Sequence, residues 1–127
     1  MRKKILIPGL ILTLVISISV ILWRKYGLPS DNNYFSAKRD IANGDVRFLS
    51  YGLPMFTSKD AEIEMVRKKY GFRSCNMGCI VTDEDFRTAE IYNNTVEEYL
   101  TKRNGKNWRI NFQREVDSLY KIASANN

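Results

Sequence analysis

The feature that most constrains this chain is an uninterrupted apolar run from Ile5 to Trp23, close to the N-terminus. The run contains no charged residue, and its polar side chains are limited to Thr13, Ser17 and Ser19. With a rise of about 1.5 Å per residue, a helix of this length reaches about 28 Å, which matches the hydrocarbon thickness of a bilayer. The sequence therefore predicts a transmembrane helix with the lipid bilayer as its partner.

The positive charge of the chain is concentrated around this run. Most of the net charge of +6 belongs to residues 1–29, and the remainder of the chain is almost neutral. A protein that binds DNA or RNA needs a concentrated basic face that neutralises phosphates, so nucleic acid is not an expected partner. The basic residues that flank the run are instead typical of a membrane anchor. They are Arg2, Lys3, Lys4, Arg24 and Lys25.

A cleaved signal peptide, with Ser17 and Ser19 at the cleavage site, is the alternative interpretation of the same segment. The apolar run continues past Ser19 as far as Trp23, and this favours an uncleaved single-pass anchor. The basic residues on the two sides of the run are nearly balanced, so they give little indication of orientation. The short leading tail favours a signal-anchor with the folded part outside the cytoplasm, on the periplasmic or cell-surface side.

The chain divides into three parts. Residues 1–29 form the anchor with its basic flanks, residues 30–33 form a short linker, and residues 34–127 form one small folded domain. A domain of about a hundred residues has room for one hydrophobic core and not for two. Because the linker is short, the domain has to stand close to the bilayer.

Hydrophobic periodicity and turn residues predict that this domain is α+β. The sheet is expected to have about three short strands, and two C-terminal helices joined at Gly105 are expected to pack antiparallel and to cover it. The expected elements are a weak helix over 34–43, a strand over 45–51, a helix from the cap Thr57 to Tyr70, two strands around the turn 76–78, a helix that starts at Thr82 and ends at Gly105, and a last helix from about residue 107.

Cys75 and Cys79 are the two cysteines, and the chain contains no His. Without His, a C-x3-C pair cannot supply the four ligands of an ordinary zinc site. If the two residues flank a hairpin turn, their separation permits a disulfide, which would form outside the cytoplasm. In an equally weighted interpretation, Cys79 is a small apolar residue at the start of a strand and Cys75 is incidental. A redox or metal role is a less favoured third interpretation.

Asp83, Glu84 and Asp85 place three carboxylates at the end of a predicted strand, where a divalent-ion or acid–base site could be built. In the structural interpretation, Thr82 and Asp85 form a capping box, and the acidic side chains in the first helical turn oppose the macrodipole. The structural interpretation is favoured. A metal-dependent enzyme that uses the three carboxylates is kept as an alternative function.

One turn forms a candidate contact surface, because it combines hydrogen-bonding side chains with a large aromatic anchor. Its residues are Arg103, Asn104, Lys106 and Trp108. In the competing interpretation, Gly105 is a helix C-cap and Trp108 is the first core residue of the next helix. The chain shows no nucleophile–base set and no phosphate-binding glycine loop, so no catalytic residue and no cofactor are predicted.

Several short stretches of the folded part resemble one known family. They are KKYGF (68–72), NGDVRFLSYGLP (43–54), GCIV (78–81), YNNTVEEYL (92–100) and RNGKNW (103–108). Together they make the chain similar to the FEKKY-domain proteins, a group of short bacterial proteins with an N-terminal membrane or export segment. The resemblance implies a bacterial setting. Since the family has no established activity, it implies no catalytic residues.

Taken together, these features favour a membrane-anchored module that acts by contact with another protein or with an envelope component. The near-neutral folded part, the short linker and the missing catalytic set motivate this hypothesis. The identity of the protein partner is not predicted. An immunity or inhibitor protein of the cell envelope fits the size and the anchor equally well.

Overall fold

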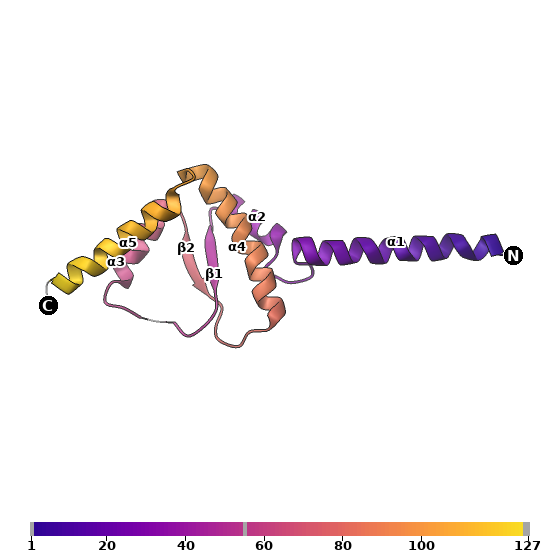
Figure 1. The fold of residues 1–127 in the computed structure, drawn as a ribbon, viewed down its shortest axis with the longest axis horizontal. Coiled ribbons are helices and arrows are strands. Elements are labelled where there is room, and N and C mark those ends of the chain that lie inside the picture. The colour runs from indigo at the N-terminus through magenta and orange to yellow at the C-terminus, as the bar shows by residue number, and fades with distance from the viewer. Residues whose placement is uncertain (1, 55, 126–127) are drawn as a thin grey trace.

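The computed structural model describes residues 2–54 and 56–125, with the side chains of residues 7–54 and 56–121. The side chains of Ile5 and Leu6, where the predicted lipid-binding run begins, lie outside this described part. The described residues form a mixed α+β fold, as predicted, and Figure 1 shows α1 projecting alone from the other elements. The elements are α1 (Arg2–Tyr26), α2 (Tyr34–Ala42), β1 (Arg47–Ser50), α3 (Asp60–Tyr70), β2 (Arg73–Asn76), α4 (Asp83–Asn104) and α5 (Trp108–Ala125).

α1 is the predicted apolar helix, and the span Ile7–Tyr26 is long and apolar enough to cross a bilayer. None of this span is buried against the rest of the chain. The hydroxyl groups of Thr13, Ser17 and Ser19 donate to backbone carbonyls of the preceding turn, at 2.8–2.9 Å. The three hydroxyl groups are thus satisfied within the helix, which is what a lipid environment requires.

The sheet consists of β1 and β2, which run parallel and are connected through the crossover helix α3. Arg47 pairs with Arg73 at one end of the ladder, and Ser50 pairs with Asn76 at the other. Parallel neighbours need such a crossover because the chain has to return to the end of the sheet from which the first strand started. The predicted strand over 45–51 is confirmed in its central part as β1.

Of the two strands predicted around the turn 76–78, the first is present as β2, whereas the second does not form, so the predicted hairpin and the sheet of about three strands are wrong for the described residues. β2 ends at Asn76, whose side chain accepts from the Gly78 N–H (2.7 Å) and donates to the Gly52 carbonyl (3.1 Å), and the chain bends at Cys79. Residues 79–82 form no strand, and Ile80 is 95% exposed. The apolar composition of this stretch resembles that of a strand. However, the crossover through α3 pairs β2 with β1, and residues 79–82 pair with neither strand.

The core lies where α4 packs against α2 and β1. Asn93 of α4 binds the outer edge of β1, because its Nδ2 donates to the Leu49 carbonyl (2.8 Å) and its Oδ1 accepts from the Leu49 N–H (2.9 Å). The side-chain amide thereby takes the place of a neighbouring strand on that edge. The buried apolar residues of α4 recur at helical spacing and are Ala89, Tyr92, Val96 and Leu100.

α5 packs mainly against α3. The two C-terminal helices meet near Gly105 and diverge from there, so the predicted antiparallel pair does not form (Figure 1). The physical reason is that α2 and β1 already occupy the apolar face of α4, which leaves α3 as the partner of α5. Aromatic rings with centroids 5.2–6.4 Å apart fill the junction between these elements: Phe48, Tyr70, Phe72, Trp108 and Phe112.

Candidate functional site

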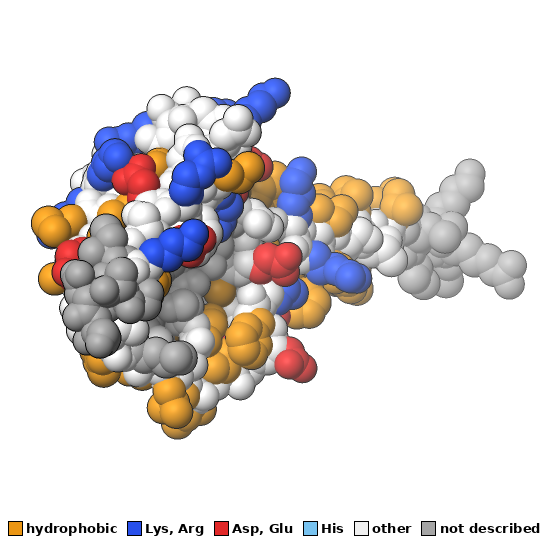
Figure 2. Space-filling view, turned by 60° about the vertical axis from the view of Figure 1, so that its left-hand side comes forward, with side chains coloured by type: hydrophobic (Ala, Val, Ile, Leu, Met, Phe, Trp, Pro, Cys, Tyr) orange, Lys and Arg blue, Asp and Glu red, His pale blue; other side chains and the backbone are white. Residues whose placement is uncertain are grey.

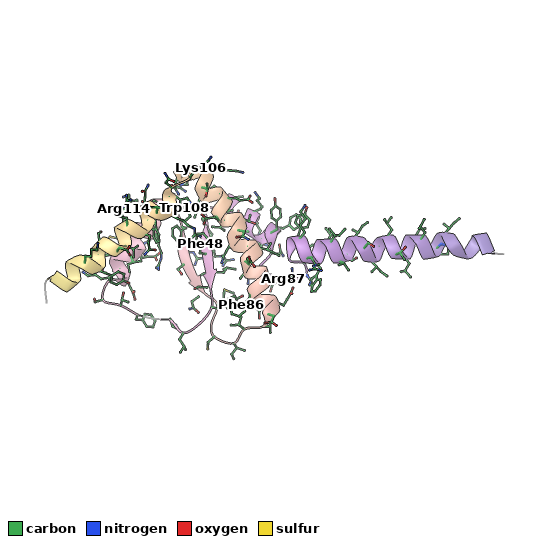
Figure 3. All side chains as sticks on the ribbon, in the orientation of Figure 1. Phe48, Phe86, Arg87, Lys106, Trp108 and Arg114 are labelled. Carbon is green, nitrogen blue, oxygen red and sulfur yellow. The ribbon has the colours of Figure 1, made fainter. Side chains whose placement is uncertain are left out.

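The C-terminal end of α1 is fixed to the first turns of α4 by Arg87. Its Nη1 donates to two carbonyl oxygens in the last turn of α1, those of Trp23 (3.0 Å) and Arg24 (3.1 Å). The guanidinium also lies 4.8 Å from the centroid of the Trp23 ring, a cation–π geometry. Figure 3 shows Arg87 on α4 close to the end of α1. Arg87 therefore caps the apolar helix.

Glu84 completes this contact between α1 and α4. It accepts hydrogen bonds from Arg87 Nε (2.9 Å) and from the indole Nε1 of Trp23 (3.1 Å). The hydrogen bond between the two charged groups lowers the pKa of Glu84 and raises the pKa of Arg87, so both are ionised at neutral pH. We refer to Trp23, Glu84 and Arg87 as the anchor joint.

The turn that follows α1 is packed against the domain as well. Gly27 is buried with φ 73°, and a Cβ at this position would lie 3.4 Å from both the Asn33 Cβ and the Thr88 Cγ2. In the predicted linker, the Ser30 hydroxyl donates to Thr88 Oγ1 (3.3 Å), and Asn33 caps α2. The segment between α1 and α2 is thus held by specific contacts and is not a free tether.

The three carboxylates considered as a metal site have separate partners. Thr82 and Asp85 form the predicted capping box: the Asp85 carboxylate accepts from the Thr82 N–H (2.9 Å), and the Thr82 Oγ1 accepts from the Asp85 N–H (3.2 Å). The hydroxyl of Thr82 also lowers the pKa of Asp85 by a hydrogen bond. Glu84 belongs to the anchor joint, and Asp83 is exposed. Within the described residues, no group of three or more acidic or cysteine side chains is placed to hold a metal ion.

Cys75 and Cys79 carry free thiols, so the structure does not support the disulfide interpretation. Cys75 lies on β2 and packs partly against the core, whereas Cys79 is exposed in the loop that follows. The disulfide depended on a hairpin that places the two residues opposite each other. That arrangement is absent, because residues 79–82 form no strand.

Trp108 cannot serve as the aromatic anchor of the candidate contact surface before α5, because it is buried in the core. Trp108 is only 2% exposed, and its Nε1 donates to the hydroxyl of Thr101 (3.2 Å). Asn104 is partly buried and donates to the Tyr70 carbonyl (2.9 Å). Arg103 and Lys106 remain exposed. The interpretation of Trp108 as a core residue is therefore confirmed.

Exposed apolar side chains gather on the two loops that follow β1 and β2. Backbone hydrogen bonds join these loops, from Met77 N–H to the Ser50 carbonyl (2.8 Å) and from Gly52 N–H to the Gly78 carbonyl (2.9 Å). Figure 2 shows hydrophobic side chains at the lower end of the molecule, and Figure 3 places Phe86 there on α4. We define the apolar tip as four exposed residues: Leu53, Met77, Ile80 and Phe86.

The apolar tip was not predicted from the sequence. The helical spacing of Phe86 is typical of a core-facing residue, and Ile80 lies in a stretch with the composition of a strand. Phe86 packs on Tyr51 at the rim of the core, at a ring separation of 5.4 Å, and stays 57% exposed. Large apolar side chains gathered at one place on a surface are a feature of interaction sites.

A buried polar cluster that the sequence did not reveal joins α2, β1 and α4. Arg47 Nη2 donates to Asp40 Oδ2 (2.7 Å), Arg47 Nε donates to the Tyr92 hydroxyl (3.0 Å), and that hydroxyl donates to Asp40 (2.7 Å). Burial raises the pKa of Tyr92 to about 12. Burial would also raise the pKa of Asp40, but the hydrogen bonds from Tyr92 and Arg47 outweigh it and lower that pKa. Each polar group has a partner inside the cluster, so we assign it a structural role.

Comparisons with protein-family models, with curated proteins and with solved structures found no match to this chain. The candidate sites are therefore interpreted from their own geometry. They are the exposed apolar helix with its anchor joint, and the apolar tip at the carboxyl end of the sheet.

Proposed function

We propose that the chain is a single-pass membrane protein whose α+β domain, held at the bilayer surface outside the cytoplasm, acts by binding another protein or an envelope component. The observation that carries this proposal is the anchor joint. An exposed apolar helix of membrane-spanning length is capped by Arg87 of the domain it carries. Such a contact supports a fixed position of the domain relative to the bilayer, which suits a module that meets its partner at the membrane.

The apolar tip supports a binding function, because large apolar side chains are exposed together on two hydrogen-bonded loops and on the first turn of α4. Exposing apolar area costs about 25 cal/mol per Å² relative to burying it, so a partner that covers this surface gains affinity. We propose that the partner binds to the tip rather than to the turn at residues 103–108.

Site-specific photo-cross-linking in intact membranes tests this function. A photoreactive side chain at Ile80 is expected to capture one defined partner repeatedly, because Ile80 is the most exposed of the apolar side chains in the tip. The matched control carries the same group at Lys102, an exposed residue on α4. The same products from both positions, or no product from Ile80, would contradict the proposed binding surface.

The resemblance to FEKKY-domain proteins remains a prediction that is consistent with an N-terminal membrane segment. An immunity or inhibitor role differs from the main proposal only in the partner, so the same cross-linking experiment distinguishes them. A captured toxin or hydrolytic enzyme would favour the immunity or inhibitor role. A captured structural component of the envelope would favour the main proposal.

A further inference from the structure

The first turn of α2 lies at the level where α1 would leave the bilayer. The ring of Tyr26, the last residue of α1, lies 5.4 Å from the rings of both Tyr34 and Phe35 in α2. Tyr26 follows the end of the apolar run at Trp23 by three residues, a rise of about 4.5 Å along the helix. The headgroup layer is about 5 to 8 Å thick on each side of a bilayer. These rings therefore fall within the headgroup layer if α1 spans the membrane as proposed above.

Two lysines lie beside these rings, and Arg24 belongs to the same last turn of α1. Arg24, Lys25 and Lys38 are exposed, and the ammonium groups of the two lysines lie 5.4 Å and 5.5 Å from the ring centroids of Tyr26 and Tyr34. None of the three takes part in the ion pairs found among the described residues. Figure 2 shows Lys and Arg side chains grouped where α1 meets the domain.

Phe35 gives this surface an apolar component. Its ring packs on the rings of Tyr26 and Tyr34, and the residue is still 52% exposed. Exposed aromatic rings beside lysines are favoured at a membrane interface, where the ring reaches the acyl boundary and the ammonium group stays among the headgroups. We refer to Arg24, Lys25, Tyr26, Tyr34, Phe35 and Lys38 as the collar.

We propose that the collar is a lipid-binding surface that selects anionic phospholipids, with Arg24, Lys25 and Lys38 at the headgroup phosphates and Phe35 inserted at the acyl boundary. α2 is then a second membrane contact of the domain, independent of the anchor joint on α4. Basic residues near an anionic surface contribute about 1 kcal/mol each. The inference rests on the proposed membrane insertion of α1, because only insertion brings the collar to the headgroups.

The full chain, reconstituted in vesicles that contain phosphatidylcholine and phosphatidylglycerol, tests this proposal. Spin-labelled lipids of the two classes report which lipid is enriched around the protein. Enrichment of phosphatidylglycerol is expected, and the double variant Lys25→Gln, Lys38→Gln is expected to reduce it by about thirtyfold, the factor that corresponds to about 1 kcal/mol for each of the two lysines. The control Lys102→Gln, Lys106→Gln removes the same charge from exposed positions outside the collar and is expected to keep the enrichment.

A spin label at position 35 gives a second readout. It is introduced as Phe35→Cys in a chain whose own cysteines are replaced by Ser, and Ala61→Cys on α3 is the control. The label at position 35 is expected to be more accessible to oxygen and less accessible to a water-soluble nickel chelate than the label at position 61. The lipid-binding role of the collar would be overturned if the membrane-inserted protein showed equal label accessibility at positions 35 and 61. It would also be overturned if the protein showed no lipid selectivity. If alkaline carbonate extracts the protein from the membrane, α1 is not a transmembrane anchor, and the proposed function is overturned as well.

Discussion

Asp40, Arg47 and Tyr92 show how single residues hold α2, β1 and α4 together. The Asp40 and Arg47 side chains are 10% and 25% exposed, and both ions are hydrogen-bonded to each other and to a fully buried hydroxyl. Buried charges of this kind are costly when one partner is removed, because the remaining charge loses both its counter-ion and its water. The cluster is therefore a sensitive point of the fold.

Substitution of Asp40 by Asn is expected to lower the free energy of unfolding by about 2 to 3 kcal/mol, because Arg47 keeps its charge and loses its carboxylate partner. Denaturant titration of the full chain in detergent micelles measures this change. Asp31→Asn, at an exposed position, is the control and is expected to change stability by less than about 0.5 kcal/mol. Equal effects of the two substitutions would contradict the structural role of the cluster.

Because the pKa of Tyr92 is raised in the folded state, we expect the protein to lose stability in alkaline solution. The unfolded chain releases the Tyr92 proton near pH 10, whereas the folded chain retains it up to a pKa of about 12. The unfolded state therefore binds fewer protons than the folded state in this window, and the free energy of unfolding falls as the pH rises from about 10 to about 12. Tyr92→Phe is expected to reduce this slope, while Tyr120→Phe, at an exposed position, leaves it unchanged. Identical slopes in both variants would contradict the assignment.

At the scale of elements, the fold protects one edge of its small sheet with a side chain. β1 and β2 are four residues each, and two strands of this length are not stable alone in water. α4 compensates in two ways, by burying its apolar face against β1 and by pairing the Asn93 amide with both backbone groups of Leu49. One residue of α4 thus connects helix packing to the hydrogen bonds of the sheet.

Asn93→Ala is expected to destabilise the folded state by about 1 to 3 kcal/mol, because the Leu49 N–H and carbonyl lose their partners beneath α4. The neighbouring substitution Asn94→Ala is a matched control, since Asn94 is exposed on the same helix. Thermal unfolding of both variants, with hydrogen exchange of the Leu49 amide, measures the difference. Unchanged protection of that amide in Asn93→Ala would show that the pairing contributes nothing.

For the molecule as a whole, the position of α1 relative to the domain depends on the anchor joint. Arg87 supplies the capping hydrogen bonds, the cation–π contact and the ion pair at the same time. Gly27 allows the close approach of the chain to Thr88 just behind this contact. These features couple the apolar helix to α4 more firmly than a flexible linker would.

Arg87→Ala is expected to increase hydrogen exchange in the last turn of α1 by about fivefold, which corresponds to about 1 kcal/mol of lost capping and cation–π energy. Exchange within the core of α4 is expected to stay close to that of the unmodified chain. Arg114→Ala, at an exposed position on α5, is the control. Exchange at the end of α1 that is equal in both variants would show that Arg87 does not fix the helix.

The exposed thiol of Cys79 provides a test of orientation without prior reduction. An impermeant thiol reagent is expected to label Cys79 in intact cells, because the domain is proposed to lie outside the cytoplasm. Cys79→Ser is expected to abolish most of this labelling, since Cys75 is partly buried. Labelling of Cys79 that requires lysis of the cells would place the domain in the cytoplasm and overturn the proposed orientation.

Local features were predictable from the sequence because they depend on neighbouring residues. The length and composition of the apolar run, the capping box between Thr82 and Asp85, and the glycine ends of α3 and α4 each involve residues within a few positions of one another. Helix propensity and capping act at this range, so a sequence pattern is sufficient to locate them. The mixed α+β class followed from the same local patterns.

Features that join distant parts of the chain were decided by tertiary structure. The hairpin, the disulfide and the antiparallel helix pair all assumed that sequence neighbours pack together, but α3 brings β2 to β1, and α5 packs on α3. Arg87 and Asn93 look like ordinary polar residues of a helix, and only their distance to Trp23 and Leu49 reveals what they bind. The sequence alone determined which segments are helical and which one is apolar enough for a membrane, because these are local properties. Tertiary structure decided which surfaces remain exposed, since that depends on which partners each element finds.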